Sequence, residues 1–255
     1  MATFDIAADE VPTRDELLRW LEAPIVKRLG AFRRGDADDA YWTMHPRIVW
    51  LKNLPLDAVV LDVGAGDGGL AAFRGWPAFP RADLEFLGLS LAAPARRNEF
   101  REFHVIDLDK AKPAFSTMPT AVLMAHVIEH LRDGRDVLRW LAGLLPRGGR
   151  IFIEWPGPNT ALLPSCDEFR SRGYPMTTLN FHDDSSHISM HAIADVIDML
   201  DELGFAVGGA GYVDLPYLSE VLRAQGLKAP RHEFYLSMGM WLRTRFSSYV
   251  AAVKR

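Results

Sequence analysis

The chain has 255 residues, 49% of them hydrophobic, and a formal net charge of −4. It contains no long basic run, so we expect neither nucleic acid nor an anionic membrane surface as a partner. Cys166 is the only cysteine, which excludes an internal disulfide and a thiolate metal cluster.

The first residues, MATFDIAADEVPTRDELL, are acidic and are interrupted by Pro12, unlike a secretory signal. No apolar run approaches the length of a membrane span. We therefore expect a cytoplasmic protein that does not cross a membrane.

Two amphipathic segments come next. The first, TRDELLRWLEAPIVKRL, has apolar residues at helical spacing behind Thr13, which is a candidate N-cap. The second, YWTMHPRIVWLKNL, is interrupted at Pro46, because proline is poorly tolerated inside a helix. We interpret residues 1–50 as a helical cap on a domain that spans residues 51–255.

Apolar, strand-like runs then alternate with helical patterns. The expected strands are AVVLDVG, LEFLGLSL, EFHVIDL, TAVLMAHVI, RIFIEWP, AVGGAGYVDL and SSYVAAVKR. Helices are expected from about Gly69, around Ala92 to Glu99, in DVLRWLAGLLPRGG and in MHAIADVIDMLDELGF. Strands that are apolar throughout and separated by helices indicate a parallel sheet covered on both faces. We predict an α/β fold: a doubly wound, Rossmann-like, mostly parallel seven-stranded sheet with an N-terminal helical extension and a helical insert at about 215–245.

A glycine-rich stretch, LDVGAGDGG, begins in the first expected strand and continues past its end. In doubly wound sheets the loop after the first strand is a usual ligand contact. Gly64, Gly66 and Gly69 fit the dinucleotide fingerprint G-x-G-x-x-G, which alone is a weak signal. A nicotinamide-binding loop would also need an acid at the tip of the second strand, where this chain has Ser90.

Together with HVIDLD, AVLMAHVIEHL and LLPRGGRIFIEWP, this stretch resembles the motifs of class I S-adenosylmethionine-dependent methyltransferases of the small-molecule type. The resemblance covers roughly residues 56–205 and the last strand. It implies S-adenosyl-L-methionine as cofactor and methyl transfer to a small molecule or sugar, at a hydroxyl. Two alternatives stay open: a degenerate protein that binds the cofactor without methyl transfer, and an NAD(P)-dependent oxidoreductase.

The resemblance also implies cofactor contacts at the glycine loop. Gly64 and Gly66, with Ala65 between them, would let the amino-acid tail lie against the backbone, where a Cβ would intrude. Asp62 would orient the ammonium group of that tail. Fixing the loop is the alternative role for Asp62.

Further contacts are implied after the second and third strands. Family members usually place an acid for the ribose hydroxyls at the position of Ser90, beside Leu91, and serine is a weaker acceptor. Asp107 resembles the acid that contacts the adenine amino group, and Leu108 is a candidate wall for the ring. Asp109 could replace Asp107 in this role, and a simple turn is the alternative.

The segment AHVIEHL contains H-x-x-E-H, a zinc-protease pattern. Metal binding would require both histidines on one face of a helix, whereas residues 121–125 read as a buried strand that places His126 at its exit. We therefore assign no metal ligand here.

In the resembling family, residues after this strand border the sulfonium and the acceptor. We assign His126 to cofactor binding and to catalysis, with His130 as the first choice of base, because histidine titrates near neutral pH. Glu129 could orient His130. Helix capping and packing is the alternative for both residues.

A second polar cluster, FHDDSSHISMH, precedes the sixth strand and its helix. Its polar residues are His182, Asp183, Asp184, His187 and His191. Loops at the carboxyl edge of a sheet often carry function, so we expect substrate contact here and take His187 as another candidate base. The cluster could hold a divalent ion, although capping is the favoured interpretation and no metal is assigned.

Two other segments leave alternatives open. Tyr41, Trp42, Thr43 and His45 belong to a region that folds over the cofactor in the resembling family, but core packing is the favoured role. The aromatic, Met-rich insert at about 215–245 could cap the acceptor pocket, form a homodimer face or simply pack.

Overall fold

The computed structural model describes residues 11–255. Most of the acidic opening segment that argued against a secretory signal, residues 1–10, lies outside the described residues. Within residues 11–255 there is no helix with the length and apolar character needed to span a membrane.

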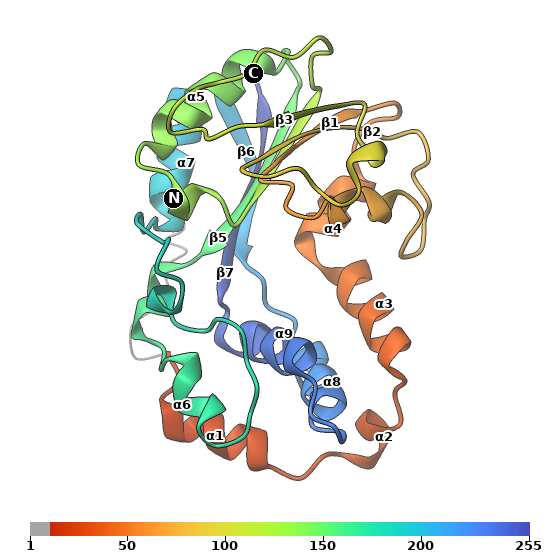
Figure 1. Ribbon diagram of the computed structural model, residues 1–255, viewed down its shortest axis with the longest axis vertical. Coiled ribbons are helices and arrows are strands. Elements are labelled where there is room, and N and C mark those ends of the chain that lie inside the picture. The colour runs from red at the N-terminus through yellow and green to blue at the C-terminus, as the bar shows by residue number, and fades with distance from the viewer. Residues whose placement is uncertain (1–10) are drawn as a thin grey trace.

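The core is a seven-stranded sheet in the order β3-β2-β1-β4-β5-β7-β6 (Figure 1). Its strands are β1 (Val59–Val63), β2 (Glu85–Ser90), β3 (Glu102–Val105), β4 (Ala121–Ala125), β5 (Arg150–Pro156), β6 (Phe205–Tyr212) and β7 (Ser247–Lys254). The strands β1 to β5 pair in parallel, and β7 is antiparallel to both of its neighbours. From β1 the chain adds β2 and β3 on one side, and it then returns to add β4 and β5 on the other side of β1. Ligands of such sheets usually bind where the strand order reverses in this way, which is here between the carboxyl ends of β1 and β4. The predicted doubly wound, mostly parallel sheet is confirmed.

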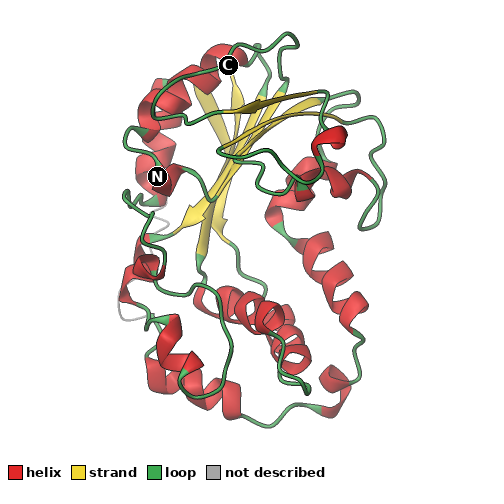
Figure 2. Ribbon diagram, viewed as in Figure 1, coloured by secondary structure: helices red, strands yellow, loops and turns green. Residues whose placement is uncertain are grey.

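Helices cover both faces of the sheet, because its central strands are apolar on both sides (Figure 2). On one face, α5 (Gly134–Leu144) and α7 (Ile193–Glu202) bury side chains against Leu61 and Val63 of β1. On the other face, α4 (Pro46–Lys52) packs near Val60. Successive side chains of a strand alternate between the faces, which places Asp62 on the α4 side of β1.

The N-terminal helices are α1 (Arg14–Glu22), α2 (Lys27–Gly30) and α3 (Arg34–Met44). Thr13 caps α1 as predicted: the Glu16 amide donates to Thr13 Oγ1 at 3.3 Å and the Thr13 amide donates to Glu16 Oε2 at 2.8 Å. The predicted interruption at Pro46 is also confirmed. Helix α3 ends at Met44 and α4 begins at Pro46, where proline is tolerated.

The insert between β6 and β7 forms two helices, α8 (Pro216–Gly226) and α9 (Glu233–Thr244). Gly239 lets these helices approach closely, because a Cβ there would lie 3.1 Å from the Arg223 amide nitrogen. Helix α8 also packs against α2 and α3. These helices, with α1 and the short α6 (Cys166–Arg170), form a helical layer beyond one end of the sheet (Figure 1).

Two sequence predictions of helices were wrong in type or extent. The segment after β1 is the 3-10 helix η2 (Gly69–Arg74), and only η3 (Arg97–Glu99) is helical within Ala92 to Glu99. Pro94 disfavours helical backbone at the residue before it, and Pro77 soon follows η2. The other 3-10 helices of the described chain are η4 (Ile128–His130), η5 (Pro158–Leu162) and η6 (Phe181–Asp183).

Candidate active site

Two cavities meet at the carboxyl end of the sheet. The strand-end cavity has a volume of about 440 Å³ and is lined by Gly64, the tip of β2, and the segments after β3 and β4. The aromatic cavity has a volume of about 330 Å³ and lies between α3, α9 and the ends of β5 and β7. His126 and His130 line both cavities, so these two side chains form the boundary between them.

The glycine loop is held by backbone contacts that leave space beside it. The amides of Gly64 and Ala65 donate to the Leu89 carbonyl at 2.9 and 3.0 Å. Gly64 has φ +76°, and a Cβ there would lie 2.3 Å from Val127 Cγ2. At Gly66, φ is +54° and a Cβ would project into open space, with no neighbouring atom closer than 3.9 Å. The loop can therefore admit a ligand against bare backbone at Gly66.

Asp62 lies in β1, two residues before Gly64, and is 5% exposed. Its Oδ2 atom makes no hydrogen bond with the described residues. Burial raises the pKa of Asp62 to about 7, although the Arg47 guanidinium acts in the opposite direction. A buried carboxylate with an unused acceptor is suited to an ammonium group. Gly64 lines the strand-end cavity, whereas Asp62, Ala65 and Gly66 are not part of its lining.

The other sequence-predicted cofactor residues line the strand-end cavity. They are Ser90, Leu91, Asp107, Leu108 and Asp109, together with His126. Asp107 lies 2.9 Å from Lys110 Nζ, and this contact holds its pKa below the ordinary value. No carboxylate follows β2 in this lining, so Ser90 offers the polar side chain at that strand tip.

His126 follows β4 and has a left-handed backbone, with φ +55°. Its amide donates to the Glu154 carbonyl at 2.8 Å, which helps to hold this unfavourable conformation. The ring lies between two carboxylates: Nε2 is 3.2 Å from Glu154 Oε1 and Nδ1 is 3.4 Å from Glu129 Oε1. Burial lowers the pKa of His126, but the two carboxylates outweigh it and raise the pKa to about 9. His126 is therefore a cation at neutral pH, which suits it poorly to the role of base.

Glu154, at the end of β5, is a site residue that the sequence reasoning missed. It is 1% exposed, and Arg47 Nε lies 3.4 Å from its Oε2. Burial raises the pKa of Glu154, but Arg47, His45 and His126 together hold it well below the ordinary value. The available signal was an acid within an apolar strand and an arginine in the α4 segment. From the sequence alone, neither Glu154 nor Arg47 indicates that the other is its partner.

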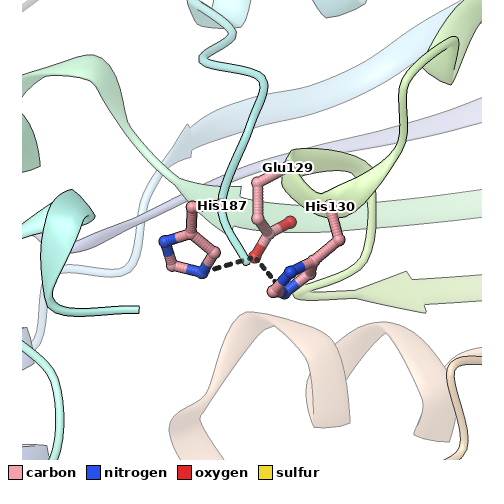
Figure 3. A group of neighbouring side chains, drawn as sticks. All are labelled: Glu129, His130 and His187. Carbon is pink, nitrogen blue, oxygen red and sulfur yellow. Dashed lines mark ion pairs between the residues drawn. The ribbon is translucent and has the colours of Figure 1, made fainter. Parts of the chain in front are cut away.

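Glu129, His130 and His187 come together from two segments that are far apart in the sequence (Figure 3). Glu129 and His130 belong to η4 after β4, whereas His187 lies in the loop before α7. The Nε2 atoms of His130 and His187 each lie 4.0 Å from Glu129 Oε1. With His126 Nδ1 at 3.4 Å from the same oxygen, all four sequence-predicted catalytic residues meet at Glu129.

The polar loop at 181–191 divides into structural and cavity-lining residues. Asp183 caps neighbouring segments: it accepts from Ser165 Oγ at 2.6 Å and from the Leu179 amide at 2.8 Å. His182 is exposed and packs edge-on against Phe181. Asp184 and His187 line the aromatic cavity, 3.8 Å apart between Oδ2 and Nε2. The favoured capping interpretation therefore applies to Asp183, and the substrate-contact prediction is restricted to Asp184 and His187.

The N-terminal helices and the insert enclose the aromatic cavity. Tyr41, Trp42 and His45 contribute to its lining at the end of α3, while Thr43 is exposed. Tyr41 and His45 are also buried, so the packing role expected of them coexists with cavity lining. From α9 come Phe234, Met238, Trp241 and Leu242. The insert thus contributes a cover to this cavity, one of the three roles that the sequence left open.

A family model described as a methyltransferase domain matches residues 31–208, which is more than half of the chain. The chain belongs to this methyltransferase family. The predicted membership of a methyltransferase family is therefore confirmed. No curated protein sequence matches the methyltransferase chain.

Solved structures of methyltransferases share this fold at low sequence identity. A chain of the complex between the Haloferax volcanii Trm112 methyltransferase activator and a methyltransferase is 15% identical, with 95% and 97% of the two chains covered and a TM-score of 0.55. Magnesium protoporphyrin IX methyltransferase from Synechocystis, with bound S-adenosylhomocysteine, is 16% identical over 93% and 92%, with a TM-score of 0.50. Phosphoethanolamine N-methyltransferase 2 from Haemonchus contortus is 16% identical over 86% and 57%, with a TM-score of 0.54.

Proposed function

We propose that this chain is an S-adenosylmethionine-dependent methyltransferase that acts on a hydroxyl of a small molecule. The observation that carries the proposal is the shared boundary of the two cavities at His126 and His130. A cofactor in the strand-end cavity and an acceptor in the aromatic cavity would meet there. Family membership and two neighbours crystallised with S-adenosylhomocysteine support the cofactor assignment.

The residues beside the strand-end cavity fit this cofactor. When bound, S-adenosylmethionine supplies a methyl group that its sulfonium activates. Asp62 would accept from the ammonium group, and the bare backbone at Gly66 would admit the amino-acid tail. Asp107 would accept from the adenine amino group beside Leu108, and Ser90 would contact the ribose.

The aromatic cavity selects the acceptor. Its volume of about 330 Å³ holds a small molecule, and Trp42, Trp241 and Phe246 provide flat apolar walls. Thr177 and Asp184 supply polar groups in the same lining. This combination favours a small apolar molecule that carries a hydroxyl over a free sugar.

The hydroxyl of the acceptor must lose its proton during transfer, and His130 lies where this would occur. It lines both cavities, and Glu129 and His187 lie beside it. His126, as a cation, would position Glu129 rather than accept the proton. Bringing the reactants together is expected to supply much of the remaining acceleration.

Calorimetric titration of the protein with S-adenosylhomocysteine, and separately with NADH, tests the proposal. We expect binding of the former with a micromolar dissociation constant and none of the latter. Binding of NADH alone would instead support the oxidoreductase alternative.

Ser90 is the observation that favours a degenerate protein, since an uncharged acceptor weakens ribose binding. Ser90→Asp should then tighten S-adenosylhomocysteine binding by about tenfold, because a charged acceptor adds ~1.4 kcal/mol. Tight binding by the natural protein with no effect of this variant would argue against the ribose assignment. Cofactor binding without turnover on any hydroxylated acceptor would favour the degenerate alternative.

A further inference from the structure

Glu129 is fully buried, at 0% exposure, and neither of its carboxylate oxygens makes a hydrogen bond with the described residues. A buried carboxylate without compensation is energetically costly. His126 lies 3.4 Å from Oε1 but is shared with Glu154, and it leaves Oε2 without a partner. Oε1, the oxygen nearest to His126, His130 and His187, makes no hydrogen bond with the described residues either, so it has unused capacity to bind a cation.

As neutral rings, the two neighbouring histidines cannot donate a hydrogen bond to Glu129, because their tautomers place the proton on the other ring nitrogen. His187 Nδ1 lies 2.7 Å from the Phe181 carbonyl, and His130 Nδ1 lies 3.2 Å from the Ser186 carbonyl. A carbonyl only accepts hydrogen bonds, so each Nδ1 must donate. In a neutral ring, Nε2 then carries a lone pair and no proton.

The arrangement around His130 is consistent with this tautomer. Ser186 Oγ donates to Asp184 Oδ1 at 2.5 Å, which leaves the hydroxyl oxygen free to accept from His130 Nδ1 at 3.0 Å. Both histidines are therefore oriented through Nδ1 by groups outside the cluster. Metal-bound histidines are typically held in this way, by a carbonyl or carboxylate on the other ring nitrogen.

With both rings neutral, as metal binding requires, three acceptors face one another: Glu129 Oε1 and the Nε2 atoms of His130 and His187 (Figure 3). One ligand atom from each residue lies within 4.8 Å of the others. Metal–ligand bonds of about 2.1 Å place the ligands of one ion ~3–4 Å apart, so the ligand atoms need to approach one another by at most ~1–2 Å.

We propose that Glu129, His130 and His187 bind a divalent first-row transition-metal ion. Two imidazoles and one carboxylate, without sulfur, suit Zn²⁺, Mn²⁺ or Co²⁺ better than Mg²⁺ or Ca²⁺. This site differs from the H-x-x-E-H pattern in the sequence, because it takes His187 in place of His126. Three protein ligands leave positions open on the ion.

The site lies beside the proposed acceptor, and its role rests on the proposed function. His130 and His187 both line the aromatic cavity, so the open positions of the ion would face that cavity. A hydroxyl oxygen bound there has a lowered pKa: its O–H bond breaks and the oxygen keeps the electron pair. The proton passes to water, because His130 Nε2 is then a metal ligand and acts through the ion rather than as the base. That pair can then form the bond to the methyl carbon as the carbon–sulfur bond breaks.

Titration of chelator-treated, tag-free protein with Co²⁺ alone tests the site, with calorimetry and the visible absorption of bound Co²⁺ as readouts. We expect one ion per chain with a micromolar dissociation constant. His130→Ala, His187→Ala and Glu129→Gln should each weaken Co²⁺ binding by at least about 10²-fold, because each removes one of three ligands. His182→Ala, in the same loop but exposed, is the matched control and should bind as the natural protein does.

S-adenosylhomocysteine titration of the same samples separates this proposal from the proposed function, and the far-ultraviolet circular dichroism spectrum of each variant shows whether it is folded. Cofactor binding with no Co²⁺ uptake, or with equal uptake by His187→Ala, would overturn the metal site and leave the proposed function standing. Co²⁺ uptake that depends on the three ligands, without cofactor binding, would support the site and reject the function.

Discussion

The ring of His126 lies 3.2 Å from the carboxylate of Glu154, at the boundary of the two cavities. Glu154 also lies 3.4 Å from Arg47 Nε, so one buried carboxylate faces two cationic groups. This arrangement fixes His126 at the exit of β4 and links α4 to β5.

Glu154→Gln should lower the free energy of unfolding by about 2 kcal/mol, because it removes the carboxylate beside Arg47 and leaves His126 with Glu129 as its carboxylate partner. Urea denaturation measures the change. Glu99→Gln is the matched control: it breaks the ion pair with Arg74 at the surface and should cost under about 1 kcal/mol. Equal costs for both variants would contradict a structural role for the Glu154 cluster.

Asp62 should make cofactor binding depend on pH. Burial raises its pKa to about 7, and an ammonium group binds the ionised form. The affinity for S-adenosylhomocysteine should therefore fall below pH 7, by up to about tenfold per pH unit, and level off above it. Calorimetry from pH 5.5 to 8.5 measures the profile, and Asp62→Asn should bind weakly with no such dependence.

The same shift has the opposite consequence for the stability of the cofactor-free protein. The folded-state pKa of Asp62 lies above the unfolded value near 3.8, so ionisation is harder in the folded state. The contribution of Asp62 to the free energy of unfolding is then lost as the pH rises from about 4 through 7. Asp62→Asn should raise the melting temperature above pH 7 in the absence of cofactor, and an unchanged melting temperature would contradict the shifted pKa.

Gly64→Ala should destabilise the protein more than a glycine substitution in an open turn. Gly64 and Gly148 have φ +76° and +80°, but a Cβ is obstructed only at Gly64, by Val127. Gly148→Ala should lower the free energy of unfolding by about 1 kcal/mol, because of its left-handed backbone alone. Gly64→Ala should lower it by a further ~1–3 kcal/mol, because of the clash with Val127. Denaturation of both variants checks this difference. Adding Val127→Ala should recover the steric part, and failure to do so would show that the clash is not the cause.

His130→Ala should lower kcat by roughly 10²-fold once an acceptor is known, because this residue lies where the hydroxyl loses its proton. His182→Ala, exposed on the neighbouring loop, should leave kcat unchanged. Initial rates at saturating cofactor measure both variants. A normal kcat in His130→Ala with bound cofactor would remove His130 from the mechanism.

The sequence by itself determined the sheet, the break at Pro46, the cap at Thr13 and the glycine loop. These features depend on short-range rules, such as the alternation of apolar residues, the fixed φ of proline and the absence of a glycine Cβ. The order of the motifs along the chain was also sufficient to predict membership of a methyltransferase family. Local rules were less reliable where helices are short, and two segments became 3-10 turns.

Only the tertiary structure decided how the site is assembled. His187 meets Glu129, Arg47 meets Glu154, and α9 covers the aromatic cavity, although each partner lies in a different element. The spacing of residues determines which face of a strand or helix they share, but it carries no information about which distant loop packs over that face. Such contacts depend on how the elements pack, and the chemistry of this site arises from those contacts.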